Sequence, residues 1–121
     1  MDVKKLKNSF VYAMRGIGEL WRGEQNFRVE VIIAVIVIAM SYVLELRSIE
    51  KAILVLIILL VLGAEAVNTV MENILDGTSR AVNPYFRVAK DILAGITLVA
   101  AVGAVLIGFI IFYPYLRPLF L

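Results

Sequence analysis

The sequence predicts an all-α integral membrane protein, in which one surface helix is followed by three transmembrane helices. Hydrophobic residues occupy 62% of its 121 positions, and the mean hydropathy is +0.94, values above those of a typical water-soluble domain of this length. Three segments are apolar over most of the length needed to cross a bilayer. We therefore expect residues 1–121 to form one membrane-embedded domain.

Residues 1–25 are predicted to form an amphipathic helix that lies along the membrane surface. Apolar side chains recur there at spacings of three and four residues, and charged side chains fall mostly on the other side. The apolar positions are Leu6, Phe10, Ala13, Met14, Ile17, Leu20 and Trp21. On this pattern alone, a simple topology anchor explains the helix as well as a functional role does.

Three transmembrane helices follow, separated by an outer turn and a cytoplasmic loop. The third is the plainest, because residues 92–113 carry no charge. The second begins with an apolar run over 52–64 that is shorter than the roughly 20 residues a span needs, so its embedded part must continue into the acidic stretch that follows. The predicted boundaries are 28–47 and 51–76 for the first two spans, 77–90 for the loop and 91–113 for the third span.

The third helix carries a small residue at every fourth position, namely Ala100, Ala104 and Gly108. Such a ridge lets membrane helices approach closely, so we expect a tightly packed or self-associating bundle. Pro114 and Pro118 are expected to end this helix on the outer side, because proline lacks the N–H that would continue the hydrogen-bond ladder.

The basic residues predict the orientation of the chain in the membrane. Six Lys or Arg precede the first span and three lie in the second loop, against two in the first turn and one in the C-terminal tail. By the positive-inside rule, the N-terminus and the 77–90 loop then face the cytoplasm. We predict a multi-pass protein of the inner (cytoplasmic) membrane.

The composition excludes several kinds of chemistry. The chain has no Cys and no His, so it lacks thiolates, disulfides, the usual general base and the commonest metal ligand. Acid–base or metal chemistry must therefore use carboxylates. A net charge of +2 is too small to indicate nucleic-acid binding.

An acidic stripe emerges from the second span and is the main indication of function. Glu65, Asn68, Glu72 and Asp76 fall at about 0°, −60°, −20° and +20° around a helix, so they share one face and extend for roughly 16 Å along it. Ionisable groups at the edge of a bilayer are costly and usually functional. Glu65, the first of them, is expected at or inside the interface.

Several carboxylates and an amide on one cytoplasmic face, with Lys90 nearby, suit a Mg-nucleotide site. Mg²⁺ takes carboxylate and phosphate oxygens, a lysine can neutralise charge on a phosphoryl group, and a remaining carboxylate can accept a hydroxyl proton. Two other classes stay open on the residues alone. One is a small transporter or channel subunit, although the outer halves of the spans are essentially apolar, and the other is a non-catalytic membrane assembly protein with buried ion pairs.

Three further charged residues have simpler explanations on sequence alone. Glu30 stands just before an apolar run, where a salt bridge with Arg28 or another basic residue would account for it. Lys90 fits a positive-inside anchor, and Asp91 fits the first turn of a helix, where the dipole favours an acidic side chain.

The stretch EAVNTVMENILD at 65–76, followed by AKD at 89–91, resembles the prokaryotic diacylglycerol kinase and undecaprenol kinase family. The segment EQNFRVE at 24–30 is similar to that family's acidic segment between the surface helix and the first span. The resemblance covers most of the chain. It implies an ATP-dependent kinase that phosphorylates the hydroxyl of a membrane lipid at the cytoplasmic interface, built as a homotrimer with shared active sites.

The resemblance also assigns roles, residue by residue. Glu65 matches the general base, and Glu24 and Glu72 match the ligands of Mg²⁺. The positions that match groups around ATP and its phosphates are Asn68, Asp76, Lys90, Asp91, Tyr12 and Lys5. Glu30 and Trp21 are expected beside the lipid substrate. A carboxylate at the bilayer edge is partly desolvated, which makes Glu65 a better base for an alcohol proton.

The lipid substrate is suggested by two further stretches. AKDILAG at 89–95 and IGFIIFYP at 107–114 resemble the undecaprenol kinase branch more than the diacylglycerol branch. We therefore expect undecaprenol to be converted to undecaprenyl phosphate, with diacylglycerol to phosphatidic acid as the alternative.

Overall fold

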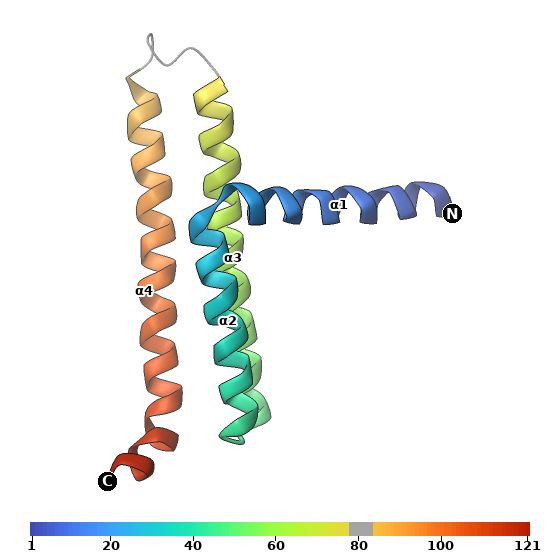
Figure 1. Ribbon diagram of the computed structural model, residues 1–121. Helices are drawn as coiled ribbons and strands as arrows, with labels where there is room; N and C mark the ends of the chain where they lie inside the picture. The colour runs from blue at the N-terminus through green and yellow to red at the C-terminus, as the bar shows by residue number, and fades with distance from the viewer. Residues whose placement is uncertain (78–83) are drawn as a thin grey trace.

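The computed structural model describes residues 1–77 and 84–121, which form four helices (Figure 1). Positions 78–83, which hold much of the predicted cytoplasmic loop, lie outside the described residues. The helices are α1 at Val3–Gly23, α2 at Gln25–Val43, α3 at Ser48–Gly77 and α4 at Tyr85–Phe120. Helices α2, α3 and α4 are each long and apolar enough to cross a membrane. The all-helical class and the three possible spans are therefore confirmed.

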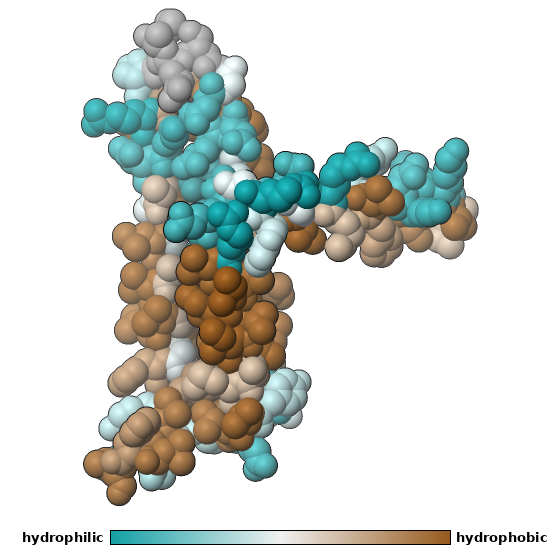
Figure 2. Space-filling model, in the orientation of Figure 1, coloured by the Kyte–Doolittle hydropathy of each residue, from teal (hydrophilic) through white to brown (hydrophobic). Residues whose placement is uncertain are grey.

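Helices α2, α3 and α4 run side by side in an elongated bundle, and α3 packs against both of the others (Figure 1). Helix α1 lies crosswise to the bundle and joins it partway along its length. Figure 2 shows an apolar trunk on one side of the level of α1 and a polar end, made by α3 and α4, on the other. The second span of the sequence thus continues as one helix from the apolar trunk into the polar end.

Helix α1 has no buried residue, and its apolar side chains are exposed, with Phe10 at 67% and Met14 at 66% of full accessibility. Its first turn is closed by Asp2, whose carboxylate accepts a hydrogen bond from the Lys5 backbone N–H at 3.1 Å. An acidic N-cap satisfies one of the donors that a helix N-terminus leaves unpaired. Local capping, not packing against the bundle, therefore supports this helix.

The buried core lies at the end of the bundle away from α1. Leu46, Leu54, Ile111 and Phe112 form one cluster there, contributed by the α2–α3 turn, α3 and α4. Because lipid tails are as apolar as leucine, such contacts stabilise a membrane bundle by close packing rather than by removal from water. This cluster joins the three long helices at one end.

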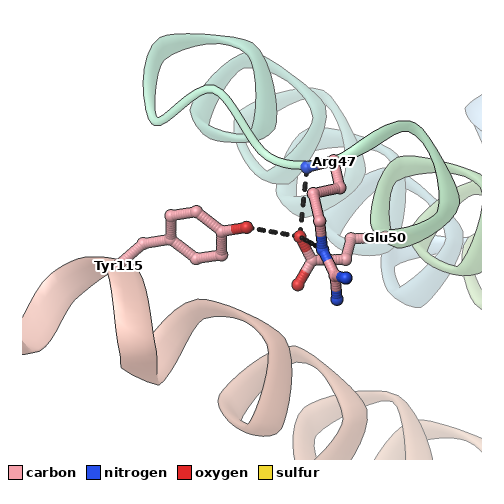
Figure 3. A network of polar contacts seen from close by, with 3 residues as sticks. All are labelled: Arg47, Glu50 and Tyr115. Atoms are coloured by element: carbon pink, nitrogen blue, oxygen red, sulfur yellow. Dashed lines mark hydrogen bonds and ion pairs between the residues drawn. The ribbon is translucent and has the colours of Figure 1, made fainter.

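A polar network reinforces that end (Figure 3). One oxygen of the Glu50 carboxylate accepts hydrogen bonds from the Arg47 backbone N–H at 3.0 Å, from Arg47 Nε at 3.2 Å and from the Tyr115 hydroxyl. The bond to the Arg47 backbone is half of a capping box, in which the third residue of a helix reaches back to its N-cap. The Glu50 carboxylate also raises the pKa of the Arg47 guanidinium. Glu50 thus starts α3 and ties it to α4.

The expectation that Pro114 and Pro118 end the third span is wrong. Both prolines lie inside α4, which continues to Phe120. A proline removes one backbone hydrogen bond and its ring presses on the preceding turn, so a helix can kink there instead of ending. Figure 1 shows the last turns of α4 bent away from the axis of the bundle.

Replacing Tyr115 by Phe removes the hydroxyl that links α4 to Glu50, and we expect the melting temperature of the protein in detergent to fall by a few degrees. A hydrogen bond to a charged group is among the stronger ones in proteins. Tyr113→Phe is the matched control, because the Tyr113 side chain is 49% exposed and its ring stacks on Phe109. Equal melting temperatures for Tyr115→Phe and the unmodified protein would contradict this role.

Candidate active site

A single extended residue, Glu24, forms the corner between α1 and α2. Its backbone has φ −118° and ψ 110°, and its N–H donates to the Leu20 carbonyl at 3.0 Å, which ends α1. Glu24 is also the N-cap of α2, yet its side chain makes no capping hydrogen bond. The carboxylate at the corner is therefore not used to hold the helix that follows it.

Glu65 is the most deeply buried ionisable side chain of the described residues, with 2% of its surface exposed. It lies on the face of α3 that also buries Val61 and Thr69. The Thr69 hydroxyl donates to the Glu65 backbone carbonyl at 3.0 Å, so it does not reach the carboxylate. Within residues 1–77 and 84–121, no hydrogen bond reaches the Glu65 carboxylate, which leaves it able to accept one from a ligand.

Three more carboxylates surround Glu65. The charges of Glu24 and Glu72 act on Glu65, and the charge of Glu65 acts on Glu30. None of the four forms an ion pair with another described residue. Like charges gathered in a partly dry site repel one another and favour a bound cation or proton. The salt bridge between Glu30 and Arg28 that sequence alone allowed is not formed.

Two polar atoms in and beside this group are buried and have no hydrogen-bond partner among the described residues. Asn68 donates through Nδ2 to Glu72 Oε1 at 3.4 Å. The Oδ1 atom of Asn68 is buried and accepts no hydrogen bond from a described residue. The Oε2 atom of Glu30 is likewise buried and accepts none. Most buried polar atoms in proteins are hydrogen-bonded, so each exception needs an explanation. Here both atoms can accept from a ligand that the chain itself does not supply.

The oxygen ligands present fit Mg²⁺ bound together with phosphates. Among the described residues, no three His, Cys, Asp or Glu side chains form a group able to hold a metal alone. Mg²⁺ is usually held by one or two carboxylates, with phosphate and water oxygens completing the octahedron. Glu24, Glu72 and the unpartnered Asn68 Oδ1 are ligands of the required kind.

The ends of α3 and α4 at the polar end of the bundle are joined by an ion pair. Lys90 Nζ lies 3.0 Å from Asp76 Oδ1, and the two side chains are 30% and 44% exposed. Asp91 instead faces solvent, with its carboxylate 4.0 Å from Arg87 Nε. The structure therefore places Lys90 and Asp76 together, past the carboxylates on α3, while Asp91 points elsewhere.

The candidate residues of α1 lie farther from the carboxylates than those of α3 do. Trp21 lies in the last turn before the corner and is 44% exposed. Tyr12 is 62% exposed, and Arg15 lies over its ring at 5.5 Å. Lys5 is about 28 Å from Glu24 along the helix axis, at 1.5 Å per residue. Tyr12 and Lys5 are thus not brought to the carboxylates of their own chain.

A cavity of about 360 Å³ opens between the long helices below the carboxylates. Glu30 is its one ionisable lining residue, and small side chains from α2 and α4, at Ala34, Ala104 and Gly108, leave the space that forms it. Leu54 and Phe112 of the buried core also line it. The cavity is therefore an apolar space that leads up to a carboxylate.

Sequence reasoning missed the part played by Arg28. Its Nη1 atom donates to the backbone carbonyls of Trp21 at 2.7 Å and Arg22 at 3.0 Å, across the corner. A basic residue soon after a predicted helix end is a signal for such a cap, because cations bind the last carbonyls of a helix. The nearby Glu30 suggested an ion pair instead.

A helical membrane protein with a buried carboxylate, further carboxylates of the kind that can bind Mg²⁺, and a lysine at one end has the features of a membrane-embedded phosphotransferase. The sequence profile described as prokaryotic diacylglycerol kinase matches residues 11–112. This match covers most of the chain, so the protein belongs to the prokaryotic diacylglycerol kinase family.

Individual relatives carry two different names. The chain is 36% identical over 115 residues to the undecaprenol kinase of Bacillus subtilis, covering 95% of this chain and 94% of that protein. It is 35% identical over 112 residues to the diacylglycerol kinase of Synechocystis, covering 92% of this chain and 64% of that longer protein. It is 30% identical to the diacylglycerol kinase of Pseudomonas aeruginosa over 81% of this chain and 80% of that protein. The named relatives are thus lipid kinases with different substrates.

Replacing Lys90 by Met breaks the ion pair with Asp76, and we expect little change in thermal stability. A solvated pair of this kind is worth at most about 1 kcal/mol. Thermal unfolding of Lys90→Met, Asp76→Asn and the double variant in detergent measures the coupling between the two side chains. A large loss of stability in Lys90→Met alone would show that the lysine is structural rather than available to a ligand.

Proposed function

We propose that this protein transfers the γ-phosphoryl group of ATP to the hydroxyl of a membrane lipid at the cytoplasmic face of the membrane. The observation that carries this proposal is the place of Glu65. It is buried beside oxygen ligands suited to Mg-nucleotide and close to Glu30, which lines the apolar cavity. A hydrophobic alcohol and a charged nucleotide can meet only where an apolar region borders a polar one, as the cavity borders the carboxylates here.

Undecaprenol is the lipid we propose, with diacylglycerol as the alternative. Two things support it: the likeness to the undecaprenol kinase of Bacillus subtilis extends over nearly the full length of both proteins, and the stretches at 89–95 and 107–114 resemble that branch. Diacylglycerol kinases are similar over slightly smaller parts of the chain.

In the proposed reaction, Glu65 accepts the proton of the lipid hydroxyl while the hydroxyl oxygen attacks the γ-phosphorus. The bond from the γ-phosphorus to its bridging oxygen breaks, and ADP leaves. Glu24 and Glu72 hold Mg²⁺, which when bound neutralises charge on the phosphates. Asn68 Oδ1 completes the oxygen ligands or accepts from the nucleotide.

Lys90 is proposed to exchange its partner Asp76 for a phosphate, with Asp91 at the edge of the nucleotide site. A lysine on a solvated ion pair can do this at small cost. Glu30 and Trp21 border the lipid, because Glu30 lines the cavity and Trp21 lies at the corner beside it. The hydrocarbon chain next to the hydroxyl then enters the cavity.

The membrane placement is part of the proposal. We place α1 as an amphipathic helix in the interface of the inner membrane, with the N-terminus in the cytoplasm, since its exposed apolar residues lie at the boundary between trunk and polar end (Figure 2). A homotrimer with shared active sites, which the family resemblance implies, would let Tyr12 and Lys5 reach the nucleotide of a neighbouring copy.

A transporter has less support. An ion path needs polar groups through the membrane, yet apart from Glu30 the cavity is lined by apolar side chains, among them Leu54 and Phe112.

Replacing Glu65 by Gln keeps the shape of the side chain but removes the base. We expect lipid phosphorylation to fall by about 10²–10⁴-fold, with the helical circular dichroism spectrum unchanged. Glu19→Gln is the control, since Glu19 is exposed and pairs with Arg22 on α1. Near-normal turnover in Glu65→Gln would remove Glu65 from the role of base.

Filling the cavity tests where the lipid chain lies. No atom outside the local helix backbone lies within 4 Å of a Cβ built at Gly108 or Gly103, and only Gly108 lines the cavity. We expect Gly108→Leu to raise the KM for the lipid and leave the KM for ATP unchanged, while Gly103→Leu alters neither. Equal lipid KM values in the two variants would place the chain elsewhere.

A further inference from the structure

The corner between α1 and α2 has few means of holding its shape. Helix α1 has no buried residue, and a single residue, Glu24, separates the two helices. The link consists of one backbone hydrogen bond from Glu24 to Leu20 and the two bonds that Arg28 Nη1 donates to Trp21 and Arg22. Among the described residues, the two bonds from Arg28 are the side-chain hydrogen bonds that cross this corner.

The guanidinium of Arg28 is well matched to this position. The last carbonyls of a helix have no partner inside it and carry the negative end of the helix dipole. A cation that bonds two of them satisfies both acceptors and gains from the dipole. Because Arg28 lies in the first turn of α2, these bonds fix the direction in which α1 leaves the bundle.

The same corner carries a carboxylate of the candidate site. Arg28 is four residues after Glu24, a spacing at which opposite charges on a helix commonly pair. Arg28 instead bonds the carbonyls of α1, and the Glu24 carboxylate forms no ion pair with a described residue. Glu24 thus has no ion-pair partner among the described residues, and its charge acts on Glu65.

We infer that Arg28 is a positioning residue: by pinning the corner it holds the Glu24 carboxylate in place for a divalent cation, without touching the cation itself. This inference rests on the proposed role of Glu24 in the kinase. Glu24 has an extended backbone and no capping bond of its own, so its direction follows that of the corner. Loss of the Arg28 bonds would let α1 swing and spread the Glu24 carboxylate over many positions.

The test uses Mn²⁺ as the probe, added together with a non-hydrolysable ATP analogue to the full-length protein in detergent micelles without lipid substrate. Electron paramagnetic resonance of free Mn²⁺ gives the binding affinity. Trp21 is the only tryptophan in the chain, and its carbonyl is one of the two that Arg28 holds, so its fluorescence anisotropy reports the mobility of the corner.

For Arg28→Met we expect the Mn²⁺ affinity to fall by about tenfold, a typical result of disturbing groups that orient metal ligands, and the Trp21 anisotropy to decrease. Arg22→Met is the matched control, because it removes an arginine from the same corner but leaves the Arg22 carbonyl; both readouts should stay unchanged. Arg28→Lys keeps the charge but has a single donor group. We expect its Mn²⁺ affinity and its Trp21 anisotropy to lie between those of Arg28→Met and the unmodified protein. It also serves as the test variant if Arg28→Met does not fold.

Glu24→Gln separates this inference from the proposed function. We expect it to weaken Mn²⁺ binding without changing the Trp21 anisotropy, since its side chain makes no bond at the corner. A normal Mn²⁺ affinity in Arg28→Met, with weak binding in Glu24→Gln, would show that Arg28 only caps a helix and would overturn the inference. Normal binding in Glu24→Gln would remove Glu24 as a ligand, and this inference with it, while lipid phosphorylation would still decide whether the protein is a kinase.

Discussion

The burial of the Glu65 carboxylate at the end of an apolar bundle is the constraint on which the rest of the site depends. A charge removed from water is costly unless nearby groups or a ligand compensate it. The charged groups that act on Glu65 are other carboxylates, at Glu24 and Glu72, and the charge of Glu65 acts in turn on Glu30, so repulsion adds to the cost. A bound cation or proton there would lower this cost. Within the described residues, Asn68 Oδ1 and Glu30 Oε2 are also buried without a hydrogen-bond partner.

Helix α3 makes this arrangement possible because it is continuous. Its apolar part packs between α2 and α4, its middle buries Glu65, and its polar end meets Lys90 through Asp76. The helix therefore carries one row of side chains from lipid to water without a loop. At the other end of the bundle, the Glu50 network and the core around Leu54 hold α3 and α4 together, so the cavity between them keeps a fixed outer end.

Hydropathy and helical periodicity were sufficient to predict the helices and the shared face of Glu65 and Glu72, because both depend on local sequence. They failed where the outcome depends on contacts between distant residues. The Tyr115 bond to Glu50 joins positions 65 residues apart, and Pro114 lies within a helix that kinks instead of ending. Arg28 had two possible partners nearby, and only the direction of α1 decides between them. The direction of α1 also determines how far Lys5 lies from the carboxylates, and sequence periodicity does not reveal that direction.

The measurement that tests the central claim most directly is transfer of radioactive γ-phosphate from ATP into the lipid extract of mixed micelles containing purified protein and Mg²⁺. Undecaprenol and diacylglycerol are supplied in separate reactions. We predict that label enters undecaprenol and that it enters diacylglycerol more slowly or not at all. Label in diacylglycerol alone would overturn the choice of lipid. A folded protein that labels neither lipid would contradict the kinase itself, and the buried carboxylates would then need another explanation.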